Sequence, residues 1–149
     1  MNSLRIDSDF FLKIAANFIL ISAFGLILPM ILIFVVHFTG YSEIFEEIVK
    51  MLVILFLVLK LPDFKLQIIG AVIFGFLFGL SESMLYLNNI FQIGDFSVFW
   101  QRFLFAVPMH IITVLVILFS GKMGKKFIIF GLAISIILHL LFNGLISIF

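Results

Sequence analysis

The side chains with the greatest chemical capacity in this sequence stand inside segments that are otherwise apolar enough to lie in lipid. They are Glu46, Glu47, Lys50, Glu82, Tyr86, His110, His139 and Asn143. A charge near the centre of a bilayer costs about 2.5–3.5 kcal/mol even on a lenient insertion scale. Such residues must therefore face protein, water or one another, which predicts a polar site within the membrane.

Two carboxylates and two imidazoles suit general-base activation of water, with further donors to stabilise an oxyanion. The sequence has no cysteine, so a thiol nucleophile and a thiolate metal site are excluded. Ser81 and Ser83 have no histidine nearby in the sequence, which disfavours serine hydrolysis. We therefore expect a site without a cofactor. Zinc held by His110, His139 and one glutamate is the alternative, although the sequence has no His-Glu-x-x-His spacing.

The composition indicates that membrane helices position these residues. Of 149 residues, 64% are hydrophobic and 11% are charged, and the mean hydropathy is +1.38, whereas soluble domains are about 45–50% apolar and about 25% charged. We predict an all-α integral membrane protein, with about five transmembrane helices bundled into a single domain over residues 1–149. The predicted spans cover about 10–38, 42–59, 66–89, 99–119 and 127–148.

Particular residues refine three of these spans. The run from residue 10 is too long for the apolar part of a signal peptide, so we expect a retained helix that is tilted or kinked near Pro29. Gly75 and Gly79 form a small-xxx-small pair, which lets a neighbouring helix approach closely. Trp100 and Arg102 are typical of an anchor at the membrane interface, and Arg102 is also a candidate contact for substrate.

The distribution of basic residues predicts the orientation. On a five-span chain, seven Lys and Arg residues belong to the N-terminal face, namely Arg5, Lys13, Lys60, Lys65, Lys122, Lys125 and Lys126. The other face has only Arg102 and Lys50. Because basic loops stay inside, we predict a cytoplasmic N-terminus and an outer C-terminus. No basic patch is long enough to indicate nucleic-acid binding.

On this topology, the polar residues of the last four spans all fall in the outer half of the membrane. Three pairs are spaced four apart and so share a helix face: Glu46 with Lys50, Glu82 with Tyr86, and His139 with Asn143. A lone buried histidine or asparagine most often only ties helices together, at about 1 kcal/mol. Four helices that contribute polar residues at one depth favour a functional site instead.

The order of these residues resembles a known pattern. Glu46-Glu47-x-x-Lys50, Gly79-x-x-Glu82-x-x-x-Tyr86, His110 and His139-x-x-x-Asn143 follow one another on successive predicted helices. This order is similar to that of PrsW-type intramembrane proteases. These resemble a wider superfamily that contains CAAX prenyl endopeptidases and bacteriocin-processing or immunity-related membrane proteins. The resemblance covers roughly residues 42–145.

The resemblance implies a glutamate-dependent peptidase embedded in the membrane. By this analogy Glu46 and His110 activate water, while His139 and Asn143 stabilise the oxyanion. The analogy favours the first glutamate as the base, with Glu47 and Glu82 as alternatives. Lys50 can reach either member of the glutamate pair and keep one ionised. Glu82 and Tyr86 are expected to support the site or to face the substrate.

The resemblance also implies a substrate class. PrsW-type members are associated with cleavage of membrane-anchored anti-sigma factors on the outer side, so the expected partners are a membrane-anchored protein or peptide and the lipid bilayer. The expected location is a prokaryotic cell membrane. Two other interpretations stay open at this point. One is a non-catalytic immunity or scaffold protein, and the other is a zinc-dependent hydrolase or metal carrier.

Overall fold

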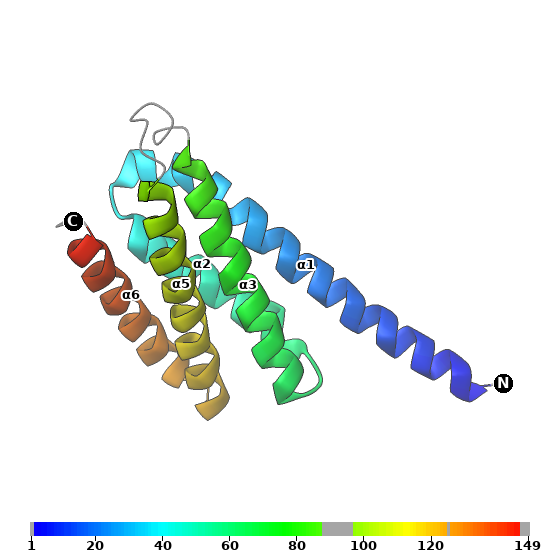
Figure 1. Ribbon diagram of the computed structural model, residues 1–149. Helices are drawn as coiled ribbons and strands as arrows, with labels where there is room; N and C mark the ends of the chain where they lie inside the picture. The colour runs from blue at the N-terminus through cyan, green and yellow to red at the C-terminus, as the bar shows by residue number, and fades with distance from the viewer. Residues whose placement is uncertain (1, 88–96, 125, 147–149) are drawn as a thin grey trace.

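The computed structural model describes residues 2–87, 97–124 and 126–146, and these residues form helices without strands (Figure 1). The elements are α1 (Asn2–Thr39), α2 (Ser42–Phe56), the 3-10 turn η1 (Val58–Lys60), α3 (Phe64–Leu85), α5 (Ser97–Met123) and α6 (Phe127–Ile146). Helices α3 and α5 pack together, α6 packs on α5, and α2 contacts both α5 and α6. Helix α1 crosses α3, and its N-terminal half extends away from the others (Figure 1). The prediction of an all-α bundle is confirmed.

Four of the described helices are long and apolar enough to cross a membrane. These stretches are Ser8–Val35, Phe64–Leu85, Phe99–Met123 and Phe127–Leu145. Helix α2 has 15 residues, or about 22 Å at 1.5 Å each, which is short of the roughly 30 Å of a bilayer core. The chain is therefore an integral membrane protein, and the orientation of its termini stays a prediction.

The helix boundaries differ from the predicted spans where side chains cap the backbone. Helix α2 ends at Phe56 and gives way to η1, whereas the predicted span reached residue 59. The buried amide of Gln67 donates to the carbonyl oxygens of Leu59 (3.3 Å) and Leu61 (2.8 Å) and so holds this turn. Asp63 then starts α3 by accepting from the Leu66 amide at 2.8 Å.

Helix α1 is also longer than the span that begins at residue 10. It is continuous from Asn2 to Thr39 and includes Pro29. Polar side chains at its start do not stop a helix, because surface helical positions tolerate them. Helix α5 likewise runs on through Met123, past the predicted end at residue 119.

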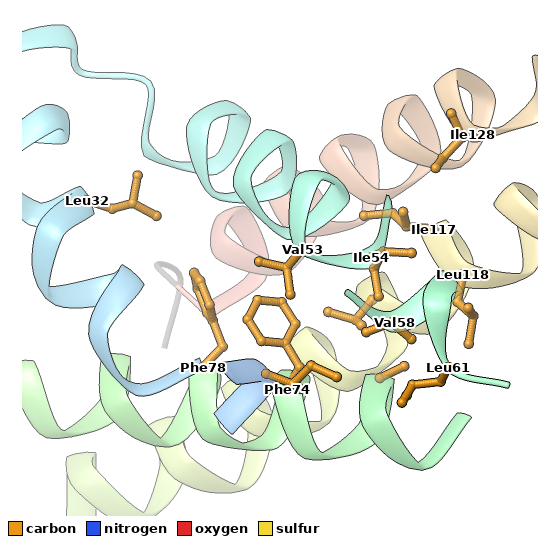
Figure 2. Close-up of a cluster of buried hydrophobic side chains, with 13 residues drawn as sticks. Leu32, Val53, Ile54, Val58, Leu61, Phe74, Phe78, Ile117, Leu118 and Ile128 are labelled. Carbon is orange, nitrogen blue, oxygen red and sulfur yellow. The ribbon is translucent and has the colours of Figure 1, made fainter. Parts of the chain in front are cut away.

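An apolar core joins α2, η1, α3 and α5 in the half of the bundle nearer the α2–α3 turn. Figure 2 shows Phe74 of α3 beneath Ile54 and Val58, with Ile117 and Leu118 of α5 beside them. All five side chains are fully buried. In lipid, such contacts stabilise the bundle by close packing, since lipid tails are as apolar as the side chains themselves.

The approach of α3 to α5 depends on two glycines. A Cβ atom on Gly75 would lie 2.8 Å from Ile111 Cα, and one on Gly79 would lie 2.9 Å from Val107 Cα. Neither distance leaves room for a side chain. The small-xxx-small interpretation of this pair is confirmed, and the contact sets His110 of α5 directly against α3.

Candidate active site

Seven polar side chains from four helices contact one another in a single network, which we call the polar cluster. Its members are Glu46, Glu47 and Lys50 of α2, Glu82 of α3, His110 and Thr113 of α5, and His139 of α6. The sequence motifs predicted six of the seven. Thr113 was missed because a threonine in an apolar helix usually bonds only its own backbone, as its Oγ1 also does here to the His110 carbonyl.

Lys50 lies at the centre of the polar cluster and is fully buried. Its Nζ lies 2.6 Å from Glu47 Oε1, 2.7 Å from His110 Nδ1 and 3.4 Å from Thr113 Oγ1. The Phe78 ring lies 4.8 Å from the same nitrogen. An ammonium group has three protons, so all its donors are engaged. Burial of this charge is tolerable because each proton has an acceptor and Glu47 supplies the counter-charge.

The contact with Lys50 determines the tautomer of His110. Because the ammonium donates to Nδ1, a neutral His110 carries its own proton on Nε2. That Nε2–H donates to Glu82 Oε2. His110 is fully buried, and both of its ring nitrogens are engaged. It therefore presents a fixed N–H donor toward the side of the polar cluster where Glu82 lies.

The contact with Glu47 determines the tautomer of His139. Its Nδ1 donates to Glu47 Oε1 at 2.8 Å, so a neutral His139 has its lone pair on Nε2. That Nε2 lies 3.9 Å from Glu46 Oε2, which is too long for a hydrogen bond. Among the described side chains, Glu46 Oε2 is one of the few buried polar atoms without a partner. Two hydrogen-bond acceptors thus face each other at 3.9 Å.

Glu46, His110 and His139 are also able to hold a metal ion. Their ligand atoms lie within 4.8 Å of one another. Two imidazoles and a carboxylate are the protein ligands of catalytic zinc in several hydrolases, at bonds of about 2.0–2.2 Å. Glu47 lies behind His139 as the carboxylate that commonly orients a metal-binding histidine.

The donor types therefore fit a zinc-type ion, which would satisfy the unpaired oxygen of Glu46. His110 joins such a site only by releasing Glu82 or Lys50, because both of its nitrogens are engaged. The expectation of a site without a cofactor is not supported by this group of residues.

The remaining predicted residues lie around the polar cluster. Asn143 is exposed, one turn beyond His139, and its Nδ2 donates to Glu43 Oε1 at 3.0 Å. This bond ties the end of α6 to the start of α2. Tyr86 follows α3 and lines a cavity next to Glu82. The side chain of Arg102 lies outside the described part of the structure.

That cavity opens where α1, α2 and α3 meet. Its volume is about 200 Å³, and both Glu46 and Glu82 form part of its wall. Side chains of α1 complete it, and no motif in the sequence pointed to them. The polar cluster is thus connected to an open space on the α1 side of the bundle.

Comparison with known proteins assigns the chain to a family. A family model described as "PrsW family intramembrane metalloprotease" matches residues 14–149. No curated protein and no solved structure matches the chain. The matched range takes in the whole polar cluster and every described α-helix except the start of α1. Since the match covers most of its length, the chain belongs to the PrsW family of intramembrane metalloproteases.

Proposed function

We propose that this protein is an endopeptidase that cleaves a membrane-associated substrate with water activated between Glu46 and His139. The observation that carries the proposal is the pair of acceptors, Glu46 Oε2 and His139 Nε2, that face each other at 3.9 Å. A water molecule can donate one proton to each of them. A base in this position typically contributes about 10²–10⁴-fold to the rate of hydrolysis.

The other members of the polar cluster support this pair. Glu47 fixes the tautomer of His139, and Lys50 balances the charge of Glu47. The resemblance to PrsW-type proteases implied that Glu46 and His110 activate the water. We favour His139, because both nitrogens of His110 are engaged and its Nε2 holds a proton toward Glu82. In this scheme Glu46 takes a proton from the water and later passes it to the leaving amine. The neutral His110, oriented by Glu82, acts only as a hydrogen-bond donor.

Asn143 stabilises the transition state in this proposal, and a metal ion is an alternative activator of the water. Asn143 lies on the same face of α6 as His139 and donates a hydrogen bond to the oxyanion of the tetrahedral intermediate. If Glu46, His110 and His139 held a divalent metal instead, the ion would replace the pair of Glu46 and His139 as the activator of water and would polarise the substrate carbonyl as a Lewis acid. The excess of basic residues on the N-terminal face favours a site in the outer half of the bilayer.

The main test compares the cut sites of cells that produce the parent protein with those of cells that produce Glu46→Gln. Glutamine keeps the shape of the side chain but cannot accept a proton from water. New protein N-termini, identified by mass spectrometry of membrane fractions, should appear with the parent and fall by about 10²–10⁴-fold with the variant. Asp63→Asn is the matched control, since it also converts a carboxylate to an amide but keeps the cap of α3.

Parental cleavage by Glu46→Gln would remove Glu46 from the mechanism. If the parent itself produced no new N-termini, a non-catalytic scaffold would be the better description. The metal is tested separately, by elemental mass spectrometry of the purified protein. A metal-dependent mechanism predicts about one equivalent of a divalent ion in the parent and its loss in His139→Ala. A metal-free parent that still cleaves would leave the Glu46 and His139 pair as the sole activators of water.

A further inference from the structure

We propose that the cavity between α1, α2 and α3 is the pocket that receives one apolar side chain of the substrate, next to the bond that is cut. This inference rests on the proposed peptidase function and adds the residue preference of the site. The cavity is the described pocket whose wall includes ionisable residues of the polar cluster, Glu46 and Glu82. A larger pocket between α5 and α6 is lined almost entirely by apolar residues and includes no carboxylate or histidine.

The size of the cavity indicates more than a site for water. Its volume is about 200 Å³, whereas one water molecule occupies about 30 Å³ in the liquid. A hydrolytic water between Glu46 and His139 therefore leaves most of the space for another occupant. Because Glu46 forms part of the wall, any occupant of the cavity lies next to the proposed base. The occupant therefore belongs to the part of the substrate that carries the scissile bond.

The chemistry of the wall selects the occupant. Pro29, Leu32 and Ile33 of α1 and Leu85 of α3 form an apolar side. This side suits an aliphatic or aromatic side chain, as apolar pockets with a few polar groups generally do. Ser42 and Tyr86 also form part of the wall and add polar side chains to it.

The charge of the wall excludes other occupants. Glu46 and Glu82 face the cavity, while the protons of Lys50 are engaged by Glu47, His110 and Thr113. An acidic side chain or a free C-terminal carboxylate would meet like charge without a compensating cation. The cavity therefore favours a neutral residue within a chain, which is the requirement of an endopeptidase and not of a carboxypeptidase.

Helix α1 offers a matched pair of positions for a test. Ile33 lines the cavity, whereas Ile31 does not, and the two are 48% and 52% exposed. At 100° per residue they lie about 200° apart around the helix. Both side chains reach the surface of the bundle, so a larger residue at either position should be tolerated by the fold. Only the residue at 33 enters the cavity.

The experiment compares the cut sites produced by the parent, Ile33→Trp and Ile31→Trp, with N-termini of membrane proteins identified by mass spectrometry. We expect parental cuts to occur next to apolar residues, with Asp and Glu absent from that position. Ile33→Trp should lower cleavage next to Phe, Leu and Met by about tenfold or more relative to cleavage next to Ala, as size mismatches in apolar pockets do. Ile31→Trp should keep the parental profile.

Two results would overturn the proposal: an unchanged profile with Ile33→Trp, or an equal fall for residues of all sizes, which would indicate a structural effect only. If Ile33→Trp fails to fold, Ile33→Ala is the second test. It widens the cavity and should raise cleavage next to Phe and Trp relative to cleavage next to Ala. Failure of the peptidase function itself looks different. In that case the parent and Glu46→Gln would have identical N-termini, whatever residue stands at 33.

Discussion

The polar cluster and the apolar core share helices α2, α3 and α5. On α2, Lys50 lies in the polar cluster and Ile54 in the core, and both are fully buried. On α5, Thr113 and Ile117 are separated in the same way. Apolar side chains gain little from each other relative to lipid, while polar ones have no partner in lipid. The core therefore fills space, and the polar cluster specifies which helix faces meet.

The largest expected effect on stability is that of Lys50→Met in the polar cluster. This change leaves Glu47 as a buried carboxylate without its ammonium partner and removes the donor to His110. The free energy of unfolding should fall by about 3–5 kcal/mol, measured by circular dichroism during heating in detergent. Lys65→Met, at an exposed position on α3, should change it by less than about 0.5 kcal/mol. Equal melting temperatures for the two variants would contradict a specifying role for the polar cluster.

Asn143→Ala should separate activity from stability. Loss of an oxyanion donor should lower kcat by about 10²–10³-fold, while the melting temperature should change little because Asn143 is exposed. Glu43→Ala removes the acceptor to which Asn143 donates but leaves the amide group of Asn143 in place. If Glu43→Ala reduced cleavage as much as Asn143→Ala, the bond between α6 and α2 would be the role of this residue, and not the oxyanion.

Gly79→Ala tests the close contact between α3 and α5, which positions His110 of the polar cluster. Its Cβ would lie 2.9 Å from both His110 Cδ2 and Val107 Cα. We expect a loss of about 1–3 kcal/mol in stability, as for other overpacked sites, together with reduced cleavage because His110 must move. Gly144→Ala is the control, since its Cβ would meet nothing within 4 Å. Parental cleavage by a folded Gly79→Ala protein would show that the position of His110 is not critical.

The smallest expected effect is that of Ile54→Val in the apolar core. Removal of one buried methylene should cost about 0.5–1.5 kcal/mol in stability, and cleavage should stay at the parental rate. Ile69→Val, at a position that is 39% exposed, should cost less. A clear loss of cleavage with Ile54→Val would mean that the core also tunes the site, and the distinction between the two regions would fail.

The sequence by itself determined the class of the protein and most of the polar cluster. Hydropathy predicts an all-α membrane protein because long apolar runs are stable only as helices in lipid. The cost of burying polar and charged groups in lipid points to six residues of the polar cluster, namely Glu46, Glu47, Lys50, Glu82, His110 and His139. The glycine pair predicts a close helix contact, because spacing of four places both residues on one face.

Only the tertiary structure decided which partners these residues take. Spacing gives directions around one helix axis, but the rotation of each helix relative to its neighbours comes from packing. Lys50 could have reached either glutamate, and it binds Glu47 and, across the bundle, His110. His139 also binds Glu47, which leaves Glu46 Oε2 without a hydrogen-bond partner. The cavity lined by α1 has the same origin, since its wall joins residues more than 50 positions apart in the sequence, and no local pattern encodes such a contact.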